Sequence, residues 1–236
     1  MLNKLSNIKL AAKIPSMIVL SALVIGVCVG AFSYFTAKSV GNTLANKHLS
    51  GVLYSKNNEL KSFIVSIEQD LSITAKNPTA LEALKAFDAA YNEFGGEAKT
   101  VLQEAYIERN TNPVGEKDKL DDAGTGSIYD QVHKQYHSWF RTALTARGYY
   151  DIFLFDMKGN VIYSVFKEAD YATNVISGKW KESDLGLAFR TAAASKDNNQ
   201  IHFTDFRAYG PSHGAPASFI SIPITDNGQK VGVLVF

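Results

Sequence analysis

The chain has 236 residues, with 24 Lys and Arg against 23 Asp and Glu, so its formal net charge is +1. This balance argues against a nucleic-acid-binding protein, which usually carries a basic stripe. The 46% of hydrophobic and 11% of aromatic residues can build a core, which argues against a disordered chain. The single cysteine, Cys28, excludes an intrachain disulfide and a cysteine-based zinc site.

The most apolar stretch covers residues 14–37, which contain no charged side chain. As an α-helix it would extend about 36 Å at 1.5 Å per residue, enough to cross a hydrocarbon layer of about 30 Å. A cleaved signal peptide usually has an apolar region of only about 7–15 residues. Here a helical pattern continues directly beyond the stretch, so we expect a retained transmembrane helix.

Positive charges flank this stretch unequally. Lys4, Lys9 and Lys13 precede it, whereas only Lys38 and Lys47 follow it closely. The positive-inside rule therefore predicts a cytoplasmic N-terminus and an exported remainder.

The chain ends in the apolar sequence "QKVGVLVF". A chain that stops within a strand leaves backbone groups without partners, so we expect a fragment that continues into a second membrane span and a cytoplasmic part. The predicted parts are a cytoplasmic N-terminus at 1–13, a transmembrane helix at 14–37, a long helix with a helical segment at 38–148, and a sheet at 149–236.

A helical pattern runs from Thr36 to Lys76, where Asn77-Pro78 ends it, because proline disfavours helix in the residue before it. One stripe of this helix is apolar, and its members are Leu60, Phe63, Ile64, Ile67 and Leu71. So long a helix cannot bury its stripe on one small domain, so we expect a parallel homodimer. The alternative is a shorter helix that folds back on its own domain.

Three more helices are predicted at 78–94, 97–110 and 128–147, the first starting at Pro78 and the last closed by Gly148. A polar loop rich in Asn, Pro, Gly and Asp precedes the last of them. After Gly148 the apolar period changes from 3.6 to 2. This predicts an antiparallel sheet of five strands at 150–156, 160–166, 201–207, 216–224 and 230–236.

Turn residues support this order. Lys158-Gly159-Asn160 separates the first two strands, with Asp156 expected to bond the backbone of the turn, and Asp226-Asn227-Gly228 separates the last two. Ser183 is a predicted N-cap for one helix between the strands. Helices followed by an antiparallel sheet predict the α+β class.

Asp130, His133 and His137 share one face of the 128–147 helix, and these residue types can bind metals. We interpret them instead as a solvated face, because one helix converges three ligands poorly, and we predict no metal site. No phosphate-binding loop and no catalytic Ser-His-Asp or Cys-His pattern is present, so neither a cofactor nor enzymatic activity is expected.

Aromatic and polar residues gather where the last helix meets the sheet. Aromatic walls bury a small polar ligand, an Arg can bind a carboxylate and an Asp can receive an ammonium. The alternative is that most of these residues belong to the core and its rim. The predicted ligand-binding residues are Trp139, Arg141, Tyr149, Tyr150, Asp151, Tyr163, Asp205, Tyr209 and Ser218, and Tyr136, Tyr171 and Arg207 belong to the same group.

Three segments together resemble a known sensor: "NPVGEKDKLDDAG", "YHSWFRTALTARGYYDIFLFDMKGNVIYSVFKEADYATN" and "FTDFRAYGPSHGAPASFISIPI". They are similar to the periplasmic Cache-type sensor of bacterial methyl-accepting chemotaxis proteins. The resemblance implies a long membrane-proximal helix, a PAS-like antiparallel sheet with helices over one face, and a final strand that leads to a second membrane span. In such receptors a HAMP linker and a methylated coiled coil follow, which signal to a histidine kinase.

Amino-acid-binding sensors of this type carry an Arg and a Trp before the first strands, then Tyr-x-Asp, and then a later Asp. Trp139, Arg141, Tyr149 and Asp151 match in residue type, but Trp139 precedes Arg141 and the spacing to Asp205 is longer. The ligand class therefore stays open.

The resulting expectation is the ligand-sensing part of a chemoreceptor in the bacterial inner membrane, with a periplasmic sensor domain and a cytoplasmic signalling partner. The sensor of a histidine kinase or nucleotide cyclase is an alternative output. A module that binds a periplasmic protein is the alternative to one that binds a metabolite.

Overall fold

The structure is a computed structural model that describes residues 9–236. Lys4 and most of the predicted cytoplasmic segment 1–13 lie outside the described residues. The chain divides into two units, one ending at Phe63 and one from Ile64 to Phe236. The helical segment from residue 64 onward therefore belongs to the same unit as the sheet.

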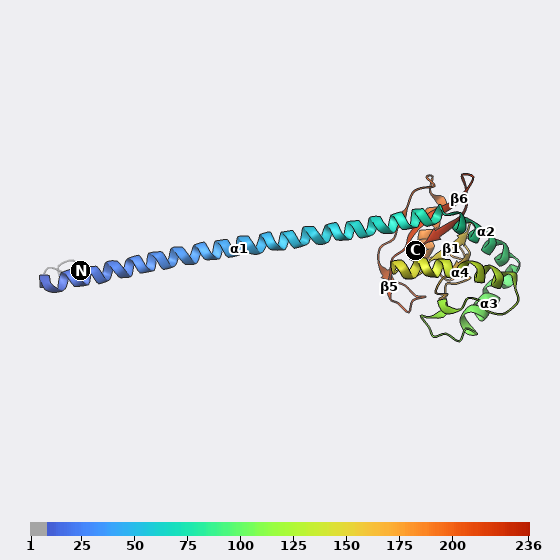
Figure 1. The fold of residues 1–236 in the computed structure, drawn as a ribbon, viewed down its shortest axis with the longest axis horizontal. Coiled ribbons are helices and arrows are strands. Elements are labelled where there is room, and N and C mark those ends of the chain that lie inside the picture. The colour runs from blue at the N-terminus through green and yellow to red at the C-terminus, as the bar shows by residue number, and fades with distance from the viewer. Residues whose placement is uncertain (1–8) are drawn as a thin grey trace. The chain divides into compact units, whose positions relative to one another are not determined.

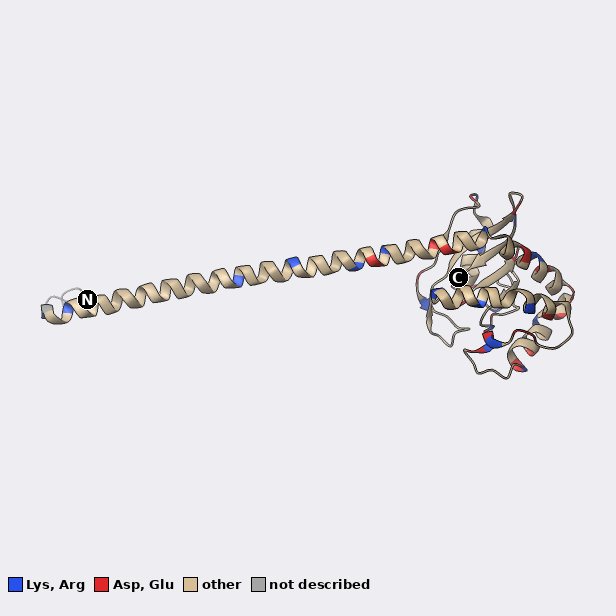
Figure 2. Ribbon diagram, in the orientation of Figure 1, with Lys and Arg blue, Asp and Glu red and all other residues tan. Residues whose placement is uncertain are grey.

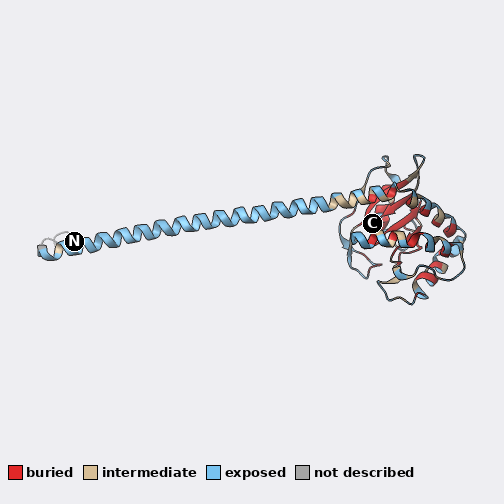
Figure 3. Cartoon of the chain, in the orientation of Figure 1, coloured by how far each residue is buried: buried red, intermediate tan, exposed pale blue. Residues whose placement is uncertain are grey.

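The first helix, α1 (Leu10–Ala75), has 66 residues and unites the predicted membrane span with the predicted long helix. Figure 2 shows no charged residue between Lys13 and Lys38. The apolar part of α1 has the length and composition of a membrane span, and none of it is buried (Figure 3). By itself this is weak evidence for a membrane, because a signal sequence passes the same test.

The apolar stripe of α1 has two different surroundings. Leu60 and Phe63 are each 56% exposed, whereas Ile67 is half-buried against the core and Leu71 is fully buried. The C-terminal part of the stripe, at Ile67 and Leu71, therefore packs on its own domain and needs no partner helix there. This agrees with the alternative that the helix packs back on its own domain.

The helices that follow begin and end at the predicted signals. The side chain of Asn77 accepts a hydrogen bond from Thr79 N and caps α2 (Pro78–Asn92). Ser127 caps α4 (Ile128–Arg147), which ends at Gly148 in the left-handed region with φ 73°. The helix predicted at 97–110 is instead three short pieces, namely the 3₁₀ turn η2 (Gly95–Glu97), α3 (Ala98–Gln103) and the π-helical turn η3 (Glu104–Glu108). One further 3₁₀ turn, η4 (Lys117–Lys119), lies in the polar loop.

The predicted α+β fold with a five-stranded antiparallel sheet is confirmed. Its strands are β1 (Phe153–Asp156), β2 (Val161–Ser164), β3 (His202–Phe203), β6 (Ile220–Asp226) and β7 (Gln229–Val235), in the order β2-β1-β7-β6-β3. Figure 1 labels β1 and β6 in the same unit as α2, α3 and α4. Both predicted hairpins form. Asn227 and Gly228 turn with φ of 49° and 82°, and Asp156 Oδ1 accepts the backbone N–H groups of Lys158 and Asn160.

Two predicted strands are wrong in extent. Residues 201–207 and 216–224 each split, and the separate ribbon of β4 (Arg207–Ala208) and β5 (Pro216–Ala217) leaves the main sheet. At the break Thr204 N still donates to Phe219 O, but Thr204 Oγ1 accepts from Phe219 N and Ser218 Oγ donates to Thr204 O. Such local bonds compete with a continuous strand.

Helices cover both faces of the sheet, not one face as the resemblance implied. Leu154 and Leu234 join the core beneath α2 and α4, whereas Phe155 and Val233 pack with α5 (Asp184–Ala194) on the other face. Period-2 alternation produces these two cores. The approach of α2 to β7 is close, because a Cβ at Gly232 would lie 2.7 Å from Cδ2 of Leu84 on α2.

Candidate functional site

A group of charged and polar side chains is buried between α4 and the loop that follows β2. We call Asp151, Lys167, Asp170, His133 and His137 the Lys167 cluster, and all five are at most 3% exposed. Charges this deep are costly unless they are paired and hydrogen-bonded. The partners of each group therefore decide what the cluster can do.

Lys167 has a left-handed backbone with φ 55°, which turns its side chain inward. Its Nζ donates to Ser164 O at 3.1 Å and to Val165 O at 2.9 Å, and lies 5.8 and 5.4 Å from the ring centroids of Tyr106 and Tyr163. An ammonium has three N–H groups, so one has no oxygen acceptor among residues 9–236. Burial lowers the pKa of Lys167 from 10.5 to about 7, against the opposing effect of Asp151.

The two carboxyl groups are each bonded on one oxygen only. Asp151 Oδ1 accepts the N–H groups of Ile152, Val165 and Phe166, which ties the start of β1 to the end of β2. Asp170 Oδ2 accepts from Tyr209 Oη at 2.5 Å. Within the described chain, Asp151 Oδ2 and Asp170 Oδ1 have no partner.

Both carboxyl groups favour the protonated form. Burial raises the pKa of Asp151 well above its ordinary value, and the nearby Asp170 adds to the effect. Burial likewise raises the pKa of Asp170 from 3.8 to about 7. Desolvation disfavours a charge that has too few donors around it.

The two histidines lie one turn apart on α4 with stacked rings, 4.2 Å between centroids. Nδ1 of His133 lies 2.8 Å from Asp121 O, so it carries the hydrogen, and Nε2 is left as an acceptor without a donor in the described part of the chain. His137 Nε2 donates to Asp118 O, and its Nδ1 accepts from Tyr163 Oη at 2.7 Å.

Burial and the charge of Lys167 lower the pKa of both rings, that of His137 to about 2. Both are therefore neutral at neutral pH. The interpretation of this helix face as solvated is wrong, because the loop at 118–121 covers it.

Five predicted residues surround this cluster. Asp151 belongs to it, Tyr163 and Tyr209 bond its members, and Arg141 Nη1 donates to Asp118 O at 2.6 Å beside His137. Tyr150 Oη donates to Glu168 Oε1 at 2.6 Å, and Ser212 Oγ donates to the other oxygen of Glu168 at 2.7 Å. This contact ties the loop to the segment that carries Tyr209.

The other four predicted residues make their contacts elsewhere. Trp139 packs edge-on against Phe140, and Tyr149 bonds Asp70 and stacks on Phe236. Asp205 is exposed and caps Phe206 N, and Ser218 bonds Thr204.

Sequence reasoning missed Lys167 and Asp170, and it weighed the histidines only as metal ligands. The available signal was a Lys and two acids in "FKEAD", directly after an apolar strand.

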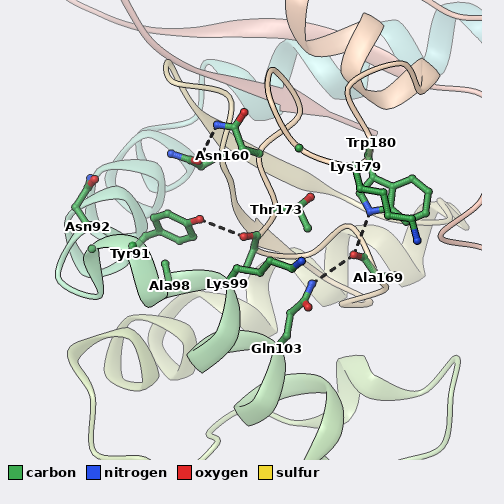
Figure 4. A pocket seen from close by; sticks show the side chains of 15 residues that line it. Tyr91, Asn92, Ala98, Lys99, Gln103, Asn160, Ala169, Thr173, Lys179 and Trp180 are labelled. Atoms are coloured by element: carbon green, nitrogen blue, oxygen red, sulfur yellow. Dashed lines mark hydrogen bonds between the residues drawn. The ribbon is translucent and has the colours of Figure 1, made fainter.

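A separate open pocket of about 680 Å³ lies between the α2–α3 region and the loop after β2 (Figure 4). Its walls include Tyr91, Lys99, Gln103 and Trp180, and the loop contributes Ala169 and the neighbouring residues 172–174. The same loop thus carries Lys167 and Asp170 inward and lines the pocket outward.

Comparison with known proteins gives one curated relative. The chain is 22% identical over 226 residues to the probable chemoreceptor y4sI of Sinorhizobium fredii, covering 96% of this chain but 28% of that receptor. The resemblance to chemoreceptors is confirmed along nearly the whole chain. No protein-family model matches it.

Two solved structures show weak similarity. The sensor domain of the V. cholerae histidine kinase DctB has a TM-score of 0.34 at 14% identity, covering 64% of this chain and 54% of that one. The extracellular domain of the putative histidine kinase vpHK1S-Z8 has a TM-score of 0.32 at 19% identity, covering 71% and 57%. Scores this low do not establish a common fold.

Proposed function

We propose that residues 64–236 are the extracytoplasmic ligand-sensing module of a membrane-anchored chemoreceptor, and that a small polar ligand binds at the Lys167 cluster. The similarity to a probable chemoreceptor over 96% of the chain supports the receptor role. A histidine kinase or nucleotide cyclase remains the alternative output. The module has no catalytic role in this proposal.

The observation that carries the ligand site is the unused hydrogen-bonding capacity of fully buried groups. One N–H of Lys167 and one oxygen each of Asp151 and Asp170 lack partners within the described residues. Native proteins keep such groups buried where they serve a role beyond packing. A ligand with both acceptor and donor groups would satisfy them, entering when the Tyr150–Glu168–Ser212 contact opens.

A structural change caused by a bound ligand could pass from the Lys167 cluster to β7 through β1. Asp151 directly precedes β1, which pairs with β7 from Phe153–Val235 to Asp156–Gly232. A shift of β1 would therefore be passed directly to β7. Coupling of about 1–3 kcal/mol between two sites is typical of receptors.

The experiment is a thermal-shift screen of small polar metabolites on the full chain in lipid nanodiscs. A ligand at 100 times its Kd adds about 2.7 kcal/mol to the free energy of unfolding. We expect Lys167→Met and Asp170→Asn to lose this stabilisation and the exposed Lys196→Met to keep it. The site would be refuted if every ligand that stabilises the unchanged protein stabilised Lys167→Met as strongly. If no metabolite in the screen stabilised the protein, the protein-binding alternative would be favoured.

The homodimer and the orientation are further parts of this proposal. Leu53 and Leu60 are 62% and 56% exposed on one face of α1 after the span, which suits a second copy of the helix. With Cys28 replaced by serine, we expect Leu53→Cys to cross-link between copies and Asn58→Cys on the opposite face to cross-link poorly. A membrane-impermeant thiol reagent should label both in intact cells. Equal cross-linking would contradict the dimer, and no labelling would contradict the orientation.

A further inference from the structure

We propose that the open pocket beside Trp180 is a second, separate binding site, and that it takes a hydroxylated carboxylate, that is, a sugar acid. We call it the Trp180 pocket. It does not depend on the ligand proposed for the Lys167 cluster, because its lining residues are different.

The charge of the lining selects an anion. The lining contains Lys99 and Lys179 and no Asp or Glu. At the rim, Asn92 Oδ1 accepts from Lys158 Nζ at 3.3 Å and Asn92 Nδ2 donates to Asp88 Oδ1 at 2.8 Å, so one cation and one anion stand there together. The two ammonium groups of the lining itself attract a carboxylate, and the attraction is strongest for a group that enters between them.

Lys99 is the cation best placed to bind it. It extends from α3 into the space between Tyr91 and Trp180 (Figure 4). Its ammonium has no hydrogen bond or ion pair among residues 9–236, and the side chain is exposed. Lys179 is less free, because its Nζ lies 4.5 Å from the Trp180 ring centroid. Lys99 is therefore the ammonium that a ligand can engage without breaking an existing contact.

The remaining lining suits hydroxyl groups. Asn92, Asn160, Asn174, Gln103 and Thr173 supply amide and hydroxyl groups, and Gly95, Gly96 and Gly178 add no side chain. The Tyr91 and Trp180 rings supply apolar walls, and Trp180 Nε1 donates to Ala169 O, which fixes the ring. A few polar groups between aromatic walls are usual for a small-molecule site, and about 680 Å³ lies within the common range.

The floor of the pocket connects it to the Lys167 cluster. Tyr91 Oη donates to Ala172 O at 3.1 Å, and Gln103 Nε2 donates to Tyr171 O at 2.7 Å. These bonds hold the loop that carries Asp170 on its inner side. An occupant that competes for them would also act on the buried cluster.

The test is calorimetric titration of the full chain in nanodiscs with matched pairs of probes. D-Galacturonate is compared with D-galactose, and D-glucuronate with D-glucose, so that each pair differs in the carboxylate. We expect at least one acid to bind and its neutral parent to bind at least tenfold more weakly, since a charge-assisted hydrogen bond contributes about that factor. Lys99→Met should lose about tenfold in affinity, and Lys196→Met should lose none.

Three outcomes would overturn the proposal: no binding by either acid, equal binding by the neutral sugars, or unchanged affinity in Lys99→Met. Lys99 is exposed and without partners, so its replacement should not disturb folding, and the circular dichroism spectrum checks this. Sugar-acid binding that survives in Lys167→Met would show that the Trp180 pocket is separate from the Lys167 cluster. The proposal for the Trp180 pocket would then stand even if no ligand bound at the Lys167 cluster.

Discussion

Replacing Phe87 by alanine should lower the free energy of unfolding by about 3–5 kcal/mol, the usual cost of removing a large buried aromatic ring. Phe87 is fully buried on α2. Its ring centroid lies 4.6 Å from that of Tyr163 on β2 and 5.3 Å from that of Tyr129 on α4. One ring thus joins both helices to the sheet, and its neighbours, fixed on β2 and α4, cannot collapse into the space it leaves.

Urea unfolding of the full chain in detergent measures this effect, followed by the fluorescence of Trp139 and Trp180, both in the unit that contains the sheet. Phe203→Ala is the matched control, because Phe203 is 53% exposed on the edge strand β3. Surface replacements usually change stability by less than about 0.5 kcal/mol. Equal losses for the two variants would contradict the described core.

Between pH 7 and pH 9 the protein should become more stable as the pH rises. Folding lowers the pKa of Lys167 from 10.5 to about 7, chiefly through burial. In this window the unfolded chain still holds the proton that the folded chain has released, so raising the pH favours folding. The slope for one group is at most about 1.4 kcal/mol per pH unit.

Other groups that face Lys167 act mainly outside this window. Folding raises the pKa of Asp170 from 3.8 to about 7. Its contribution to stability therefore falls as the pH rises through that range. His133 and His137 have lowered pKa values and act in the opposite sense below about pH 6.5. Raised tyrosine pKa values, such as that of Tyr91 at about 12, matter only near pH 10 and above. Asp151, whose pKa is raised by burial and by the nearby Asp170, contributes with the same sign as Asp170 and reduces the slope from Lys167 wherever it still titrates.

Urea unfolding at pH 7, 8 and 9 measures the slope. Lys167→Met should remove it, because methionine does not titrate, and Lys196→Met should retain it. The variant is also expected to be no less stable at pH 7, since an apolar chain of similar length replaces a buried cation. A slope in Lys167→Met equal to that of the unchanged protein would show that Lys167 does not titrate in this window.

Much of the backbone could be predicted because the signals are local. Asn77-Pro78 starts α2, Gly148 ends α4, and Asn227-Gly228 forms a hairpin, each through contacts within a few residues. The apolar stripe at Ile67 and Leu71 could also be predicted from the sequence. The surface that covers it could not, because an apolar face does not specify its partner. The split after Phe203 depends on Thr204 and Phe219, which approach each other only in the folded chain.

The candidate site was half predictable for the same reason. Tyr163 and Asp151 stood out as an aromatic residue and an acid beside a strand, and both lie at the cluster. Lys167 looked like an ordinary surface lysine, yet its backbone turns with φ 55° and sends the ammonium inward. His133 and His137 looked solvated because the chain that covers them, at residues 118–121, has a single apolar residue, Leu120, among charged ones.

The amino-acid sequence by itself determined the apolar span, the α+β order and the positions of caps and hairpins, since these follow from periodicity and from residues close along the chain. The tertiary structure decided that β7 lies between β1 and β6, and that two histidines, two aspartates and a lysine are buried together. Burial of a polar side chain depends on segments distant in sequence, and no local pattern encodes which segment will cover it.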